Sequence, residues 1–472
     1  MVVLLAPIWL VRFPPLLDYP NHLASTFVLN NLRSTDFLFH AYYGADWRPY
    51  PNLTSEILLM ILQHVLPVRI AGQVVLSLSV LALPCAAWFF LEQVSPGEGH
   101  LAAWSLLIVF NPFLLMGFLN YDLSIALCFL AVGLWLRYLK EPAAGRWWGL
   151  LAVVTLLYFT HLGGFVVAGF VMFVYGLLSR LPLKMLLKSW AVFLPGVAFL
   201  LTLVSRGANE GGSQWLPFAQ KIRNLATPLL GYSFRTDLIT CILLAGVVAI
   251  LVAGNRELRW RMPWLGVAAA LLAVYLLLPE AYASTQTDTR LLPFLFIVGL
   301  AVAQVGHRGK LLIPVALLIF GVRMAVVTRY FLAEQPRMAG WAESFAVTPR
   351  NVRVLPLVEG PDGPGMEKPY SHFWAYGIIQ RGWLVPYLFS RKDIHVVRIR
   401  AQAYTPQGMG YTYRKTPDWA HVEQDYDYVW AYNVPEFSAE LSAIGVPIYH
   451  FEKLVVYRLS RQPGNRVRKS NR

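Results

Sequence analysis

An aspartate and a histidine stand four residues apart near the start of the chain, in the stretch FPPLLDYPNHLA. Asp18 and His22 follow an almost purely apolar lead, and Pro14-Pro15 is expected to end a first helix there. If the next residues are helical, the two side chains lie on one face. They could then act as a general base or ligate a divalent metal, whereas the simpler interpretation is a capping Asp18 beside a surface His22.

Cationic side chains in later polar segments could bind phosphate. Arg290 opens an apolar run in STQTDTRLLPF, and the longest polar connection holds Lys221, Arg223 and Arg235. A guanidinium binds two phosphate oxygens at once. Ordinary snorkelling to lipid headgroups explains each cation equally well, so both interpretations stay open. Three further polar residues, each expected to be structural more often than catalytic, are Glu56, Asp122 and His161.

The elements that must position these residues are membrane helices. Of 472 residues, 57% are hydrophobic and only 14% are charged, and the mean hydropathy is +0.50. Soluble domains are about 25% charged, so this composition predicts an integral membrane protein. Met1–Leu17 lacks the basic start and the cleavage site of a signal peptide, which favours a retained first helix. The clearest apolar runs are Ile70–Leu91, Leu101–Phe118, Leu123–Leu139, Ala191–Val204, Leu238–Ala253 and Leu311–Val327.

Basic residues beside the apolar runs predict the orientation, since cytoplasmic loops are rich in Lys and Arg. They place the N-terminus inside, the C-terminus outside and about eleven crossings between, with Asp18 at the outer surface. Leu53–Leu66 is too short to span and reads as a juxtamembrane or re-entrant helix, and YFTHLGGF interrupts the run Trp147–Leu178. The basic residues are Arg137, Lys140, Arg146, Arg180, Lys184, Lys188, Arg256, Arg259, Arg261, Arg308 and Lys310.

Composition changes near residue 330 and predicts three regions. Residues 1–329 form a multi-helix membrane domain, whose first outer loop spans 18–69, and 330–460 form an extracytoplasmic α/β domain. Residues 461–472 form a basic disordered tail. In the second region we expect strands in NVRVLPLVEG, DIHVVRIRA and YDYVWAYNV and a turn at PDGPG. We also expect an aromatic helix or helix-turn in YSHFWAYGIIQRGWLVPYLF, a helix in PEFSAELSAIG, and a closing hairpin or strand pair in VPIYHFEKLVVYRLS.

Several classes of function are disfavoured. Cys85, Cys128 and Cys241 fall in predicted membrane helices, so the outer regions carry no disulfide framework. The net charge of +14 comes largely from cytoplasmic loops and the tail, and no nucleic-acid-binding module is present. The tail is expected to be disordered or to contact anionic lipid. No glycine-rich nucleotide loop precedes a Lys-Ser or Lys-Thr pair.

The layout resembles the GT-C glycosyltransferase superfamily, and is similar to bacterial protein O-mannosyltransferases and the lipid A aminoarabinose transferase. The resemblance covers residues 1–329. It is carried by PPLLDYPNHLA, PNLTSEILLMILQHVLPVRIAGQVVLSL, FNPFLLMGFLNYDLSIALCFLAVGLWL and RLLPFLFIVGLA. The first-loop motif of that superfamily more often pairs two acidic residues, whereas Tyr19 follows Asp18 here.

This resemblance implies transfer of a sugar from a polyprenyl-phosphate donor to a glycan, lipid or protein acceptor at the outer face of the cytoplasmic membrane. Asp18 would be the base, with His22 orienting it, or both would ligate a divalent metal, a role that stays open. The cations expected to stabilise the leaving phosphate are Arg290 together with Lys221, Arg223 or Arg235.

Two other classes compete with an enzyme. A transporter or flippase would favour internal repeats and charges at mid-membrane depth, but no repeat is evident and ionisable residues lie near helix ends. A non-catalytic assembly protein would use the aromatic segments HFWAYGIIQRGW and YDYVWAYN to bind a partner. Those rings could equally pack a small core or stack on sugars.

Overall fold

The computed structural model describes residues 2–204, 213–254, 258–281, 286–306, 308–358, 370–391, 394–400 and 417–460. The chain divides into two compact units. The helical unit comprises Met1–Val11, Pro49–Leu58 and Gln73–Leu332. The mixed unit comprises Arg12–Arg48, Leu59–Gly72 and Ala333–Arg472. The expected regions 1–329 and 330–460 therefore stay a prediction, and PDGPG and the basic tail 461–472 lie outside the described residues.

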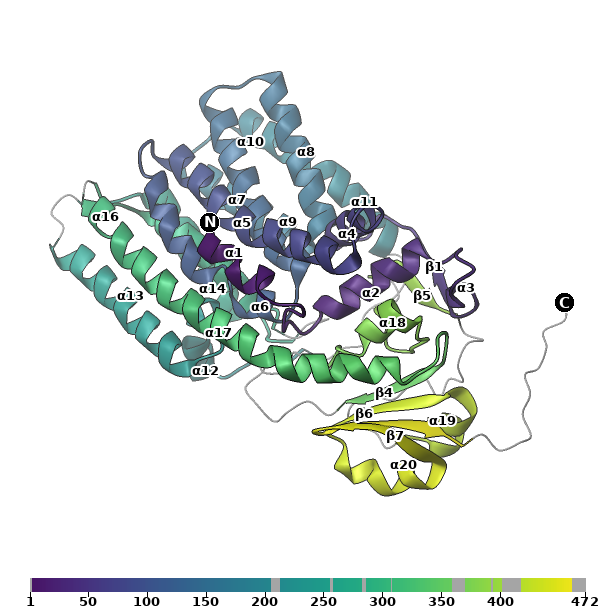
Figure 1. The fold of residues 1–472 in the computed structure, drawn as a ribbon. Helices are drawn as coiled ribbons and strands as arrows, with labels where there is room; N and C mark the ends of the chain where they lie inside the picture. Colours follow the sequence, from purple (N-terminus) through teal and green to yellow (C-terminus); the bar gives the residue numbers. More distant parts are fainter. Residues whose placement is uncertain are drawn as a thin grey trace. The chain divides into compact units, whose positions relative to one another are not determined.

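The helical unit is built from apolar helices. In it α7, α8 and α9 pack against one another, and α14 packs against α9 and α15 (Figure 1). Three helices, α4, α5 and α17, run from one unit's residues into the other's. The bounds are α1 Val2–Trp9, α5 Val68–Val94, η1 Gly99–Ile108, α6 Pro112–Leu115, α7 Leu119–Lys140, α8 Ala144–Thr160, α9 Leu162–Leu178, α10 Leu183–Trp190, η2 Ala191–Phe193, α11 Leu194–Val204, α12 Phe218–Asn224, η3 Thr227–Leu229, α13 Phe234–Gly254, β2 Arg259–Trp260, α14 Met262–Leu277, η4 Thr289–Leu291, α15 Leu292–Val302, β3 Ala303–Gln304, α16 Arg308–Leu311 and α17 Ile313–Ala346.

Five helical segments of the described chain are long and apolar enough to cross a membrane. They are Val68–Val94, Leu119–Lys140, Leu183–Leu203, Phe234–Ala253 and Ile313–Ala346. Five further apolar helices are shorter: Thr54–Gln63, Gly99–Ile108, Leu162–Leu178, Met262–Leu277 and Thr289–Val302. The number of about eleven crossings stays a prediction.

Two apolar runs fold differently from expectation. Leu101–Phe118 is not one helix, because a 3-10 helix ends at Ile108 and α6 begins anew at Pro112. Asn111 forces this restart: its side-chain oxygen caps the amides of Phe113 and Leu114 at 2.9 and 3.2 Å. The first helix likewise ends at Trp9, well before Pro14-Pro15. The break in Trp147–Leu178 is confirmed, since α8 ends at Thr160 and α9 begins at Leu162.

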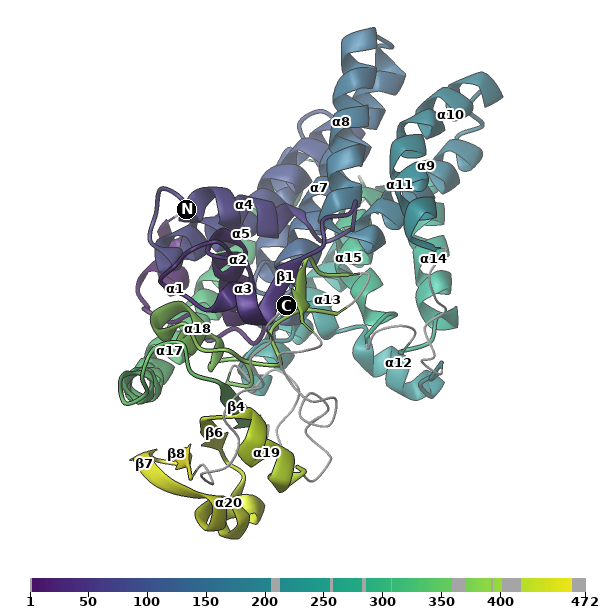
Figure 2. The same cartoon turned by 90° about the vertical axis from the view of Figure 1, so that its right-hand side faces the viewer.

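The mixed unit contains a four-stranded sheet of order β4-β6-β8-β7 (Figure 2). Strand β4 (Val354–Val358) pairs parallel with β6 (Tyr428–Tyr432), and β8 (Leu454–Leu459) pairs antiparallel with β6 and with β7 (Gly445–Phe451). Every residue of β4 and β6 is buried, as expected for strands covered on both faces. Helices α19 (Trp419–Asp425) and α20 (Ser438–Ile444) complete the fold. The predicted strands, second helix and closing hairpin are confirmed.

The rest of the mixed unit holds the Asp18 segment. Helix α2 (Tyr19–Asn30) packs against α18 (Ala375–Arg381), and the backbone before it is bound by Gln335 of α17. The Gln335 side chain accepts from the amides of Arg12 and Phe13 at 2.9 and 3.1 Å, and donates to the Phe13 carbonyl at 2.9 Å. This amide clamp replaces the helical hydrogen bonds that the proline-rich stretch cannot make. The remaining elements are α3 Phe39–Tyr42, β1 Tyr43–Ala45, which pairs with β5 Val397–Ile399, and η5 Pro435–Phe437, while α4 (Thr54–Gln63) has residues in both units.

A glycine in α5 allows the start of α2 to pack closely. A Cβ built at Gly72 would lie 2.3 Å from the Tyr19 hydroxyl and 2.7 Å from a Leu23 methyl carbon. Gly72→Ala is therefore expected to lower the free energy of unfolding by about 1–3 kcal/mol, the usual effect of overpacking a core. The thermal midpoint of the purified protein in detergent measures it.

The matched control is Gly149→Ala in α8, because nothing lies within 4 Å of a Cβ built there. That change is expected to leave stability unchanged or raise it by up to about 1 kcal/mol through helix propensity. Equal midpoints for the two variants would contradict the close approach of Tyr19 to α5.

Candidate functional site

Asp18 occupies the N-cap position of α2, but its side chain makes no capping hydrogen bond. Instead its Oδ1 lies 2.9 Å from Nδ1 of His372, just before α18, an ion pair when the imidazole is protonated. The contact is short but is not aligned as a hydrogen bond. Both side chains are largely covered, with 17% and 18% exposed. The carboxylate is thus held beside an imidazole and not consumed by helix capping.

A phenyl ring organises the imidazoles around this pair. The rings of His22 and His372 both meet Phe389 edge to face, with centroid distances of 5.2 and 5.6 Å. His395 stacks on the same ring at 5.0 Å. The helix face that carries Asp18 and His22 is therefore directed at the segment of Phe389, and His372 is the imidazole that reaches the carboxylate.

Asn21 attaches that segment to α2. It is fully buried, its Oδ1 accepts from the Phe389 amide at 3.0 Å, and its Nδ2 donates to the Tyr387 carbonyl at 3.5 Å. A buried side-chain amide that binds backbone on both sides fixes the two segments relative to each other. The position of Phe389, and with it the histidine rings, follows from this contact.

A second cluster, in the helical unit, surrounds Arg290 at η4. Its guanidinium carbon lies 4.9 Å from the ring centre of Phe118 and 5.9 Å from that of Tyr121. The Tyr121 hydroxyl donates to the Arg290 carbonyl at 2.6 Å, and the Tyr121 ring meets His161 edge to face at 5.3 Å. We call Phe118, Tyr121, His161 and Arg290 the arginine cluster. Stacking on two rings orients the guanidinium and retains its charge.

Polar residues at the start of α7, beside Tyr121 of this cluster, attach that helix to the segments before it. Asn120 of α7 donates to Glu56 and to the Asn52 carbonyl, both at 2.8 Å, and accepts from the Ser55 amide at 2.8 Å. Asp122 is buried and accepts from Asn111 at 2.7 Å. These contacts give Glu56 and Asp122 the structural setting expected of them.

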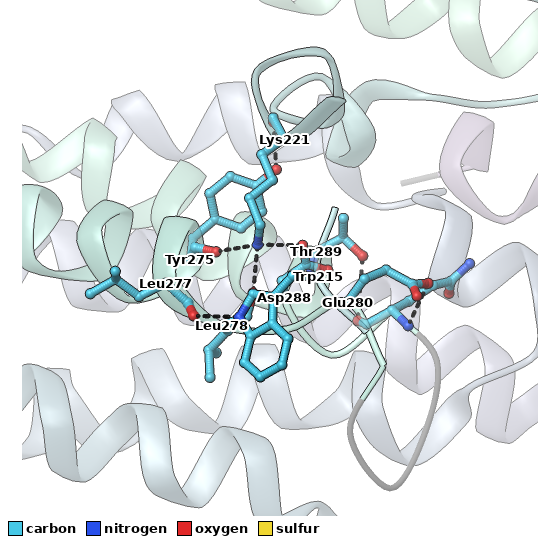
Figure 3. Close-up of polar contacts among 9 residues, drawn as sticks. Trp215, Lys221, Tyr275, Leu277, Leu278, Glu280, Asp288 and Thr289 are labelled. Atoms are coloured by element: carbon cyan, nitrogen blue, oxygen red, sulfur yellow. Dashed lines mark hydrogen bonds and ion pairs between the residues drawn. The ribbon is translucent and has the colours of Figure 1, made fainter. Parts of the chain in front are cut away.

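Lys221 forms a buried ion pair (Figure 3). Its Nζ donates to Asp288 at 2.9 Å and to the carbonyls of Tyr275 and Leu278 at 3.0 and 2.6 Å. Those carbonyls end α14, a position that favours a cation. Asp288 is fully buried and also accepts from the Thr289 amide at 2.7 Å. All three N–H donors of Lys221 are engaged, so a phosphate oxygen would have to displace one of them.

The other expected cations lie on the surface. Arg223, on α12, and Arg235, on α13, are exposed. As for a metal, no three His, Cys, Asp or Glu side chains come together in a metal-holding group within the described chain. The metal role of Asp18 and His22 stays a prediction, and we derive no step through a metal.

No protein-family profile and no curated protein matches the chain. Solved structures match it by their fold. ArnT from Cupriavidus metallidurans bound to undecaprenyl phosphate matches with a TM-score of 0.53 and 11% identity, covering 97% of this chain and 96% of that one. The apo state of the same protein matches with a TM-score of 0.55 and 10% identity, covering 97% and 95%.

The chain has the GT-C fold. The resemblance stated from the sequence is confirmed at the level of fold, and it extends over nearly the whole chain and not only over residues 1–329. The shared fold and the five long apolar helices of the described chain together indicate a multi-pass membrane protein.

Within this GT-C fold the structure adds residues that sequence reasoning missed. His372 lies far along the chain from Asp18, and no spacing rule connects them. Tyr121 and Phe118 carry no charge, so only their positions against Arg290 reveal their roles. His161 was noted from the sequence as a polar residue more often structural than catalytic, and its signal is the break THLGG in an apolar run.

Proposed function

We propose that this protein is a membrane glycosyltransferase that moves a sugar from a polyprenyl-phosphate donor to an acceptor at the outer face of the cytoplasmic membrane. The observation that carries the proposal is the match to ArnT bound to undecaprenyl phosphate over nearly the full length of both chains. A lipid-linked donor is already activated, which accords with the lack of a nucleotide-binding glycine loop in the sequence.

Asp18 serves as the general base in this proposal. It takes the proton of the acceptor hydroxyl as the acceptor oxygen bonds to the anomeric carbon, and the bond from that carbon to the phosphate oxygen breaks. His372, 2.9 Å from the carboxylate, orients it and keeps it from capping α2. His22 supports the ring of Phe389, against which His372 packs.

Arg290 binds the phosphate of the donor and the lipid phosphate that departs with the electron pair. Its guanidinium is oriented by Phe118 and Tyr121. A fixed positive charge aimed at a developing phosphate anion lowers the barrier, since the group needs no reorganisation during the reaction. Arg223 and Arg235 remain candidates for weaker contacts with the lipid, and Lys221 supports the fold through Asp288.

The proposed orientation follows the basic loops: the N-terminus lies inside, and the C-terminal α/β domain lies outside. This orientation presents Asp18 to acceptors beyond the membrane. Either a glycan, a lipid or a protein offers the hydroxyl that the reaction needs.

The test is transfer of radiolabelled sugar from undecaprenyl-phosphate-linked donors by purified protein in lipid nanodiscs. Transfer by the wild-type protein is expected with at least one donor of a panel. No transfer and no binding of undecaprenyl phosphate would overturn the proposal in favour of a transporter or an assembly protein.

In the same assay, Arg290→Gln is expected to raise the KM for the donor about ten- to a hundredfold. A hydrogen bond to a charged group contributes about 1.5–3 kcal/mol. The substitution removes both the positive charge and the pair of parallel N–H donors of the guanidinium. Arg259→Gln, an exposed arginine in β2, is the matched control and should leave KM unchanged. Equal KM values for the two variants would exclude Arg290 as the phosphate ligand.

A further inference from the structure

His161 stands between α8 and α9, and its imidazole has a defined tautomer. Its Nδ1 accepts a hydrogen bond from the Gly163 amide at 3.1 Å, as the N-cap of α9. A backbone amide can only donate, so Nδ1 carries no proton and the neutral ring carries its proton on Nε2. Among the hydrogen bonds of the described residues, none involves Nε2 of His161. The ring thus offers one N–H donor.

Two glycines allow this placement. A Cβ at Gly163 would lie 3.0 Å from both Nδ1 and Cε1 of His161, so the imidazole packs directly against the glycine backbone. A Cβ at Gly164 would lie 2.7 Å from the Ser124 hydroxyl, so α9 approaches α7 closely. The sequence HLGG is therefore explained by the position of one imidazole at a tight junction of helices.

The surroundings keep this imidazole neutral. Desolvation lowers the pKa of His161 to about 3, and the positive charge of Arg290 acts in the same direction. Since this pKa lies far below neutral pH, the ring is uncharged there. The His161 ring also packs at a right angle against the ring of Tyr121, whose hydroxyl donates to the Arg290 carbonyl. A neutral donor and a guanidinium are thus oriented by one tyrosine.

We propose that Nε2–H of His161 donates a hydrogen bond to the phosphate of the lipid carrier, beside the guanidinium of Arg290. This inference rests on the proposed function. A neutral donor adds a directed contact without a second cation that must be desolvated. The departing lipid phosphate bears more negative charge than the sugar-linked diester, so the bond strengthens as the sugar leaves.

The test distinguishes the role of His161 as the N-cap of α9 from its proposed role as a hydrogen-bond donor to phosphate. His161→Asn retains an oxygen for the Gly163 amide, because asparagine is a good N-cap, but has no N–H at the position of Nε2. In His161→Gln, the side-chain amide N–H lies about as far from the backbone as the Nε2–H of histidine. Binding of undecaprenyl phosphate in nanodiscs, measured by microscale thermophoresis, is expected to weaken about tenfold in the Asn variant and less than threefold in the Gln variant. Melting temperatures without the lipid report on folding.

Each outcome decides the matter. An Asn variant that binds as tightly as the wild-type protein overturns the donor role and leaves His161 as a cap only. Equal losses in both variants with lowered melting temperatures overturn it in favour of a structural role. If the wild-type protein transfers sugar, these results bear on His161 alone. If the wild-type protein neither binds the lipid phosphate nor transfers sugar, the proposed function itself fails, and this inference fails with it.

Discussion

Asp18→Asn is expected to lower the rate of sugar transfer by about 100- to 10,000-fold and to leave donor binding within twofold. The reason is that a general base contributes about that factor, and an amide cannot take the proton of the acceptor hydroxyl. Asparagine has the shape of aspartate, and the Asp18 side chain makes no capping hydrogen bond that the change could disturb. The measurement is single-turnover transfer at saturating donor.

The control for Asp18 is Asp36→Asn, in the same polar stretch of the mixed unit, where the side chain is exposed. That variant should retain wild-type rates. His372→Gln is expected to fall between the two, because it loses the imidazole 2.9 Å from Asp18 but leaves the base itself in place. Full activity of Asp18→Asn would remove this residue from the chemistry.

Lys221→Met is expected to lower the free energy of unfolding by about 3–5 kcal/mol. The substitution leaves the Asp288 carboxylate fully buried without its cation, and an unpaired buried charge is strongly destabilising. It also removes the donor to two carbonyls at the C-terminal end of α14, those of Tyr275 and of the C-cap residue Leu278. Thermal unfolding in detergent, followed by circular dichroism, measures the change.

The double variant Lys221→Met with Asp288→Asn tests the cause. Asparagine still accepts from the Thr289 amide, and no buried charge remains, so much of the lost stability should return. Additive losses in the two single variants and the double variant would show that the two residues are energetically independent. A normal melting temperature with a raised donor KM in Lys221→Met would instead support the phosphate role expected from the sequence.

The sequence by itself determined the class of the protein and the identity of most elements. Long apolar runs predict membrane helices because lipid leaves no other partner for backbone polar groups. Short apolar runs rich in β-branched and aromatic residues, bounded by turn signals, predict strands β4, β6, β7 and β8. Local rules also predicted the helix after Asp18 and the break at His161, since both depend on neighbours a few residues away.

Only the tertiary structure decided which polar residues meet. Helix capping is a local rule and suggested a role for Asp18, but His372 reaches the carboxylate from a segment far along the chain. Lys221 reads as a surface cation, yet it is buried because Asp288 and the end of α14 satisfy all its donors. Arg290 is aimed by two rings of the α7 region. Burial and pairing arise from long-range packing, which residue spacing does not encode.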